Sequence, residues 1–150
     1  MLIEFIGKIW KKLPKKGRTL ITRRFQVKFT ASAAAIITNE RGEVLLLDHV
    51  LRPGSGWGMA GGFLNFGEQP EAALRREIRE ETGLELSNVK LYRIRTFKRH
   101  IEIIFLAKAV GEAVVRSREI TELGWFTVDD MPAEMSIDQQ FIIRTALGPE

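Results

Sequence analysis

The sequence predicts an α/β domain in which a mixed β-sheet with few helices is covered on both faces. Several short segments rich in Val, Ile, Phe and Thr are separated by turn signals, and only two helical patterns follow them. A chain of 150 residues suffices for one domain that buries about two-thirds of its unfolded surface. With no Cys and 2 His, the chain excludes disulfides, thiolate zinc sites and cysteine nucleophiles. A reducing, cytoplasmic location is therefore expected.

The net charge of +4 is unevenly distributed. Residues 1–30 carry nine Lys or Arg against the single acid Glu4, a balance of +8, so the rest of the chain has a balance of −4. Attraction to phosphates or anionic lipid would therefore act through this basic arm. We divide the chain into a basic amphipathic segment, residues 1–24, and a domain, residues 25–150.

Residues 2–13 place apolar side chains at helical spacing with lysines between them, and Pro14 and Gly17 break the pattern. The segment is too short for a transmembrane helix and no small-residue cleavage site follows it. Two interpretations are open. The apolar side packs on the domain or on a second subunit, as in a dimer, or residues 1–20 lie on a membrane surface or a nucleic acid.

The next segments alternate between strands and turns. Residues 25–38 and 43–50 are predicted strands joined by a turn at residues 39–42, followed by a loop from Arg52 to Gly58. Further strands are predicted at residues 89–98, 101–110 and 120–126, with a turn near residues 99–100 and another at residues 129–132. Ser136 begins a closing helix to Leu147, whose predicted apolar side is Ile137, Phe141, Ile142 and Ala146.

The chain's chemistry is concentrated in residues 62–84, GFLNFGEQPEAALRREIREETGL. A glycine-rich loop enters a helix on which Glu77, Glu80 and Glu81 share about 100° of arc. Like charges at i,i+4 cost about 0.2–0.5 kcal/mol in an isolated helix, and a solvated face would alternate signs. Carboxylates gathered in this way favour a hard cation, so the pattern predicts a magnesium-dependent enzyme acting on phosphates.

Both ends of this helix are well marked. Pro70 suits its first turn and Gly83 its C-terminal end. Leu74, Ile78 and Thr82 form the face expected to turn toward the sheet, so the glutamates lie beside the buried stripe.

The residues of this stretch now carry a specific similarity. Gly62, Glu68 and residues 76–84 (REIREETGL) resemble a complete Nudix box of 23 residues, and the similarity extends from the Phe29 strand to the turn at residues 129–132. Relatives commonly have Pro where this chain has Ala60, a change that removes no ligand. The resemblance implies an α/β/α sandwich and hydrolysis of a nucleoside diphosphate linked to another group. It also implies one or more Mg²⁺ or Mn²⁺ ions.

The resemblance assigns roles within the box. Glu80 and Glu81 are the expected metal ligands, against the alternative of a surface pair bridged to Arg76. Glu77 is a further ligand or the general base. Glu68 reaches the metals through water or caps the helix start. Gly62 is counted among the metal-binding positions because its backbone passes close to the helix and the metals.

Two roles need residues beyond these ligands. Arg76 is expected to orient a glutamate, against an ordinary i,i+4 bridge to Glu80. Glu119 is expected to complete the site from outside the box, with Glu122 as the alternative and a solvated loop carboxylate as the bland interpretation.

The substrate is less well indicated. Arg52 and Arg99 are candidates to meet phosphates and Trp57 and Phe97 to stack a base, against ordinary surface or packing roles. No proline occurs between Gly83 and Pro132, which weakens the case for the ADP-ribose subgroup. Three classes remain: a hydrolase of nucleotides or other small diphosphates, the same chemistry on an RNA 5′ end, and a non-catalytic binding module.

Overall fold

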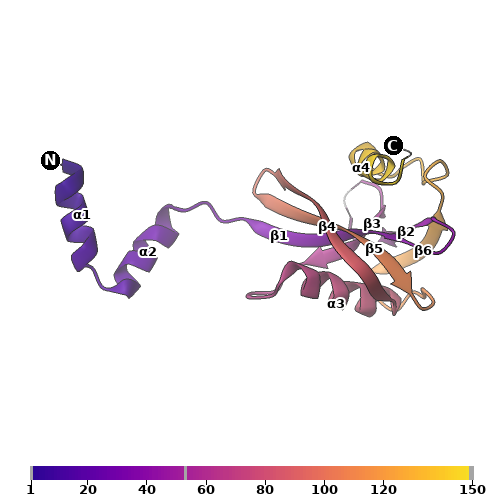
Figure 1. The fold of residues 1–150 in the computed structure, drawn as a ribbon, viewed down its shortest axis with the longest axis horizontal. Coiled ribbons are helices and arrows are strands. Elements are labelled where there is room, and N and C mark those ends of the chain that lie inside the picture. The colour runs from indigo at the N-terminus through magenta and orange to yellow at the C-terminus, as the bar shows by residue number, and fades with distance from the viewer. Residues whose placement is uncertain (1, 53, 149–150) are drawn as a thin grey trace.

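The computed structural model describes residues 2–52 and 54–148 and contains four helices and six strands in these residues. Figure 1 shows a sheet with α3 on one face and α4 on the other, while α1 and α2 lie apart from it. In chain order the elements are α1 (Leu2–Lys12), α2 (Lys15–Phe25), β1 (Thr30–Thr38), β2 (Val44–His49), β3 (Trp57–Phe63), α3 (Pro70–Thr82), β4 (Glu85–Phe97), β5 (His100–Val110), β6 (Ile120–Phe126) and α4 (Ile137–Leu147). The α/β/α sandwich with a mixed sheet is confirmed.

The six strands have the order β4-β5-β1-β3-β2-β6. β1 and β5 run parallel, in register from Thr30↔His100 to Thr38↔Lys108, and the other neighbours are antiparallel. Because β3 pairs with β1 on one side and β2 on the other, the residues that enter the glycine-rich loop are held in the middle of the sheet.

The core has two layers because alternate residues of β1 and β2 face opposite sides of the sheet. On the α3 side, Ala33, Ala35, Ile37, Leu45 and Leu47 pack with Leu74 and Ile78. On the α4 side, Ala34, Ile36, Val44 and Leu46 pack with Met135, Ile142 and Ile143. The helix that carries the glutamates is thus fixed on the sheet through the apolar stripe that the sequence predicts.

Several predicted boundaries are wrong. Residues 25–29 are not strand, since α2 ends at Phe25 and β1 begins at Thr30. The sequence did not predict α2 because Pro14 suggested a break, although proline is tolerated just before the first turn of a helix. The many basic residues of α2 also hide any apolar periodicity. β3 was not expected because Gly58, Gly61 and Gly62 weaken its strand signal.

The closing helix α4 is correct in extent, and its predicted apolar side is half right: Ile142 is buried and Ala146 packs against the core, as expected. Ile142 and Ile143 are its buried residues, whereas Ile137 and Phe141 are exposed. Two adjacent isoleucines define a narrow contact stripe, because the helix lies on the sheet along one line.

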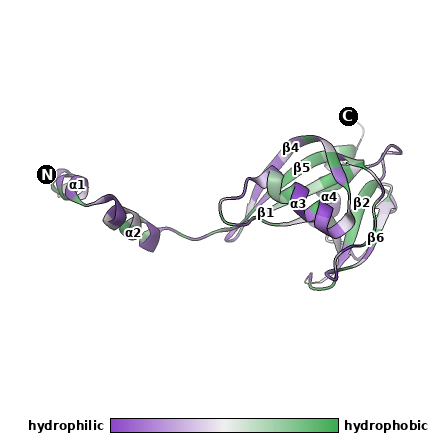
Figure 2. Cartoon of the chain, turned by 90° about the horizontal axis from the view of Figure 1, so that it is seen from below, coloured by the Kyte–Doolittle hydropathy of each residue, from purple (hydrophilic) through white to green (hydrophobic). Residues whose placement is uncertain are grey.

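The N-terminal helices form an arm outside the sandwich. Figures 1 and 2 both show α1 and α2 away from the sheet, joined to β1 by an extended link. The apolar side of α1 therefore does not pack on the domain, which removes one of the interpretations open from the sequence. None of the helices in the described part of the chain has the length and apolar character to span a bilayer.

Candidate active site

The glycine-rich entry to α3 lets β3 approach the helix closely. A Cβ at Gly62 would lie 2.4 Å from the Cδ of Glu77, so only glycine leaves room for this carboxylate. Gly61 has φ +147, and a Cβ there would lie 2.2 Å from the carbonyl oxygen of Ala33 in β1. The backbone of residues 61–62 and the carboxylate of Glu77 consequently share one wall of the site.

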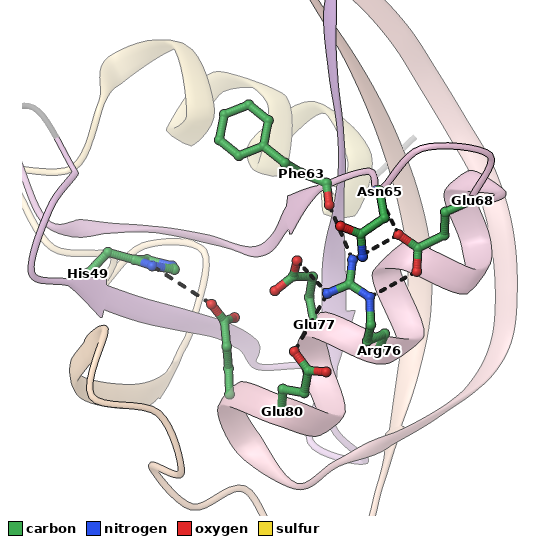
Figure 3. A network of polar contacts seen from close by, with 8 residues as sticks. His49, Phe63, Asn65, Glu68, Arg76, Glu77 and Glu80 are labelled. Atoms are coloured by element: carbon green, nitrogen blue, oxygen red, sulfur yellow. Dashed lines mark hydrogen bonds and ion pairs between the residues drawn. The ribbon is translucent and has the colours of Figure 1, made fainter.

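Arg76 links Glu68, in the loop before α3, to Glu77 and Glu80 in the helix (Figure 3). Its Nε and Nη2 donate to the two oxygens of Glu68 at 2.8 and 2.9 Å, and its Nη1 donates to Glu77 Oε1 at 2.8 Å. The same Nη1 lies 3.5 Å from Glu80 Oε2, and Nη2 donates to the Phe63 carbonyl oxygen. A forked, two-point contact of this kind fixes side-chain orientation as well as charge.

Glu68 is held by this network on the outer side of the loop. Besides Arg76 it accepts a hydrogen bond from the Asn65 N–H at 2.9 Å. The Arg76 guanidinium is the main cause that lowers the pKa of Glu68 to about 2. Glu68 is therefore a permanently ionised anchor that fixes Arg76 and the Asn65 turn.

Glu81 differs sharply from the exposed glutamates of α3. It is buried, its Oε2 has no hydrogen-bond partner, and its Oε1 lies 4.0 Å from His49 Nδ1. Burial, and then the negative charge of Glu77, raises the pKa of Glu81 to about 8. An unpartnered buried carboxylate oxygen costs free energy unless a donor or a cation meets it.

His49 faces Glu81 from the end of β2, where the β2–β6 register shifts between Asp48 and His49. Burial, and then the nearby positive charge of Arg52, lowers the pKa of His49 to about 4, so the imidazole is neutral at pH 7. Its Nε2 is also buried without a partner. His49 thus supplies a polar but uncharged wall to the glutamate cluster.

His49, Glu77 and Glu81 line one cleft of about 440 Å³, whereas Glu68, Arg76 and Glu80 are not among its lining residues. Its residues are His49, Leu51, Arg52, Gly61, Gly62, Phe63, Asn65, Glu77, Glu81 and Glu119. A second cavity of about 180 Å³ adjoins it and shares Arg52, Gly61, Gly62 and Phe63, adding Ser32, Met59, Glu102 and Gln139 among others. Arg52 is half-buried and donates to the carbonyl oxygens of Gly56 and Met59, so its cation is held between the two cavities.

The structure brings together only part of the predicted substrate set. Arg52 lines the cleft, whereas Trp57 packs edge-on against Phe126 with ring centroids 5.3 Å apart in the α4-side core. Phe97 and Arg99 belong to the hairpin end between β4 and β5 and line neither cavity.

The outside glutamate can also be placed. Glu119 lines the cleft and its charge adds to the pKa rise of Glu81. Glu122, the alternative, lies within β6 opposite Asp48 and does not line the cleft.

The cleft residues that were not expected from the sequence include His49, Leu51, Phe63 and Asn65. His49 lies 21 residues before the start of α3 at Pro70, and only the pairing of β2 within the sheet brings it to the cleft. Phe63 and Asn65 lie inside the box. Their position in the sequence next to Gly62 could have indicated that they line the same wall of the cleft.

The oxygen-rich donors of this cleft fit a hard divalent cation. Within residues 2–52 and 54–148, no three acidic or imidazole side chains already converge as a ready metal centre. The carboxylate of Glu81, whose Oε2 has no partner, nevertheless lies near the negative charges of Glu77, Glu80 and Glu119, which help to raise its pKa. Carboxylates with little histidine and no thiolate are the ligands that Mg²⁺ prefers.

A glycine-lined, carboxylate-rich cleft beside a helix of an α/β/α sandwich has the donors to hold a hard divalent cation together with a phosphate group. The family model for the NUDIX domain matches residues 28–145. The chain therefore belongs to the Nudix family.

Comparisons with individual proteins agree with this membership. The crystal structure of a MutT NUDIX hydrolase from Burkholderia pseudomallei is 27% identical, with a TM-score of 0.70 over 79% of this chain and 98% of that one. A NUDIX hydrolase from Nitrosomonas europaea shares the fold, with a TM-score of 0.72 at 19% identity over 81% of this chain and 72% of that one. The NAD-capped RNA hydrolase NudC of Citrobacter koseri is 30% identical over 92 residues, which are 59% of this chain and 36% of that protein. The chain thus spans about a third of the length of this curated relative.

Proposed function

We propose that this chain is a divalent-metal-dependent pyrophosphohydrolase that cleaves a nucleoside diphosphate linked to another group, with water as the nucleophile. The observation that carries the proposal is Glu81, buried in the cleft with a raised pKa and an unpartnered oxygen. Mg²⁺ or Mn²⁺ at this carboxylate would remove the repulsion that Glu77, Glu80 and Glu119 impose on it.

Four glutamates would divide the work. Glu81 and Glu77 face the cleft and would hold the cation, with Glu80 joining from the exposed side of α3. When bound, the cation supplies positive charge to the diphosphate and activates water. Glu119 lines the same cleft without belonging to α3. It would accept the proton of the attacking water as the oxygen of that water bonds to phosphorus and the phosphate leaving group departs.

Arg76 acts in this proposal as a positioning residue. Its contacts with Glu68 on one side and Glu77 on the other keep the Glu77 carboxylate on the cleft wall formed by Gly62. Arg52 contributes a fixed cation between the two cavities, where it would meet a phosphate. The diphosphate would then lie in the larger cavity and the nucleoside side in the smaller one beside Phe63.

A second candidate substrate is the 5′ end of an RNA. It is supported by the name of the Citrobacter koseri relative, an NAD-capped RNA hydrolase, and by the basic arm at the N-terminus. An RNA end presents the same diphosphate to the cleft, so the two candidates differ only in what is attached to it.

The proposal is tested by hydrolysis assays with nucleoside triphosphates, dinucleotides such as NAD, nucleotide sugars and capped or triphosphorylated RNA. We expect activity that requires Mg²⁺ or Mn²⁺ and that falls at least about a hundredfold in Glu81→Gln. Glu122→Gln, an exposed glutamate of β6 outside the cleft, is the matched control and keeps full activity. Turnover that persists in EDTA or in Glu81→Gln would contradict the proposal.

A further inference from the structure

The helix α1 separates its apolar and charged residues completely. At about 100° per residue, Ile3, Phe5, Ile6, Ile9 and Trp10 fall within about 160° of arc. The charged residues Glu4, Lys8, Lys11 and Lys12 fall within about 100° on the opposite side. A helix of 11 residues with such an apolar face is marginal alone in water and needs a surface to cover that face.

Nothing in the described chain covers the apolar face of α1. The side chains of Phe5, Ile6 and Ile9 are exposed, and Ile3 is 84% exposed. Figure 2 shows green, hydrophobic stretches among the purple ones on the arm, which lies away from the green strands of the sheet. Contiguous exposed apolar residues of this kind mark an interaction site.

The second helix adds positive charge and no acidic residue. α2 carries Lys15, Lys16, Arg18, Arg23 and Arg24. Where α1 meets α2, a hollow of about 500 Å³ is lined by Trp10, Lys15, Arg18, Thr19, Thr22, Arg23 and Gln26. An indole beside three cations suits the boundary between acyl chains and anionic headgroups, where tryptophan is enriched.

We propose that residues 2–25 hold this hydrolase on an anionic phospholipid surface, with the apolar face of α1 in the headgroup region and α2 against the phosphates. Charge complementarity and the apolar face together select this partner. A nucleic acid would match the cations but would leave the apolar face uncovered. A second copy would match the apolar face but would bring two strongly positive arms together. An apolar insertion combined with a polybasic segment supplies the two signals that stable membrane attachment requires.

The attachment leaves the catalytic domain free to work. The residues between α2 and β1, Gln26 to Phe29, belong to no helix or strand and separate the arm from the sandwich. Neither cavity of the site includes a residue of α1 or α2. A substitution in the arm should therefore weaken membrane binding without lowering the hydrolysis rate, and a substitution in the cleft should do the reverse.

The test is co-sedimentation of the full chain with vesicles of phosphatidylcholine alone or of phosphatidylcholine with phosphatidylglycerol. We expect binding to the anionic vesicles only, weakened by high salt. Ile3→Glu should reduce that binding at least tenfold. Ile137→Glu, at an isoleucine of α4 that is also 84% exposed, is the matched control and should bind as the parent does. Both variants should hydrolyse nucleotides at the parent rate.

A fluorescence measurement reports insertion itself. The emission of Trp10 should shift to the blue on anionic vesicles, and Trp10→Phe should lose this shift while Trp57 and Trp125 remain. Absence of vesicle binding would overturn the proposal, as would equal binding by Ile3→Glu. The proposal would also be overturned by a dimer in size-exclusion chromatography that Ile3→Glu converts to a monomer. Binding to RNA that anionic vesicles do not displace would overturn it too.

Discussion

The helices α1 and α3 are both amphipathic, but only one of them has its apolar face covered within this chain. In α3, Ala73, Leu74 and Ile78 are fully buried against the sheet. In α1, Ile3 and Ile6 are exposed and the helix lies away from the sheet. Helical periodicity therefore identifies a helix with two faces, but it does not identify what covers the apolar one.

The charged faces of the two helices differ in the same way. In α3, Arg76 lies among three glutamates and holds two of them within hydrogen-bond distance, at Glu68 and Glu77. In α1, the three lysines Lys8, Lys11 and Lys12 lie on the same side of the helix. Charges with partners inside the chain shape a site, whereas an excess of one sign favours an external surface of the opposite sign.

The largest difference between the two helices should appear in stability. Leu74→Ala removes a fully buried side chain and should lower the free energy of unfolding by about 2–5 kcal/mol. Ile6→Ala removes an exposed one and should change it by less than about 0.5 kcal/mol. Urea unfolding followed by circular dichroism measures both. Equal losses would show that α1 packs on the folded domain after all.

The fold was predictable wherever a local pattern and its tertiary environment agree. α3 and β6 are found where the pattern indicates because their apolar spacing matches the face they bury. β3 was missed because its glycines have little strand propensity, and hydrogen bonds from neighbours on both sides keep it extended. On α4 the expected Ile142 is buried, but Ile137 and Phe141 are exposed and the unexpected Ile143 is buried in their place.

Part of the cleft's lining was predictable from the sequence, within the box at Glu77 and Glu81 and outside it at Arg52 and Glu119. Glu77 and Glu81 face the cleft from one helix, where their spacing fixes their direction. His49 arrives from β2, and only strand pairing brings it to Glu81. Trp57 is an aromatic beside the box in sequence, yet it faces the α4-side core, because successive side chains of a strand alternate between faces.

Glu81 allows the comparison to be extended to pH. Its folded-state pKa of about 8 lies above the ordinary value of 4.5, so the unfolded chain ionises first as the pH rises. The protonated carboxyl contributes its full share of stability below pH 4.5, and that share is lost up to about pH 8. Glu81→Gln should therefore gain stability over the parent across this window, by on the order of a few kcal/mol.

The measurement is the difference in unfolding free energy between Glu81→Gln and the parent at a series of pH values, which cancels the titration of all other groups. Saturating Mg²⁺ should shrink the difference, since it would stabilise only the chain that keeps the carboxylate. A difference that stays constant from pH 4 to pH 9 would show that Glu81 titrates normally.

The smallest expected effect concerns Arg76 and separates orientation from charge. Arg76→Lys keeps the positive charge but loses the forked contact with Glu68 and cannot reach Glu77 at the same time. We expect kcat to fall about ten- to a hundredfold, the range for residues that orient metal ligands, while the unfolding midpoint changes little. Arg75→Lys, on the same helix and paired with Glu71 outside the cleft, is the matched control and should keep kcat. If both variants keep kcat, Arg76 supplies only its positive charge to α3. Its forked contacts would then not orient the glutamates, and it would act by charge alone, like the lysines of α1.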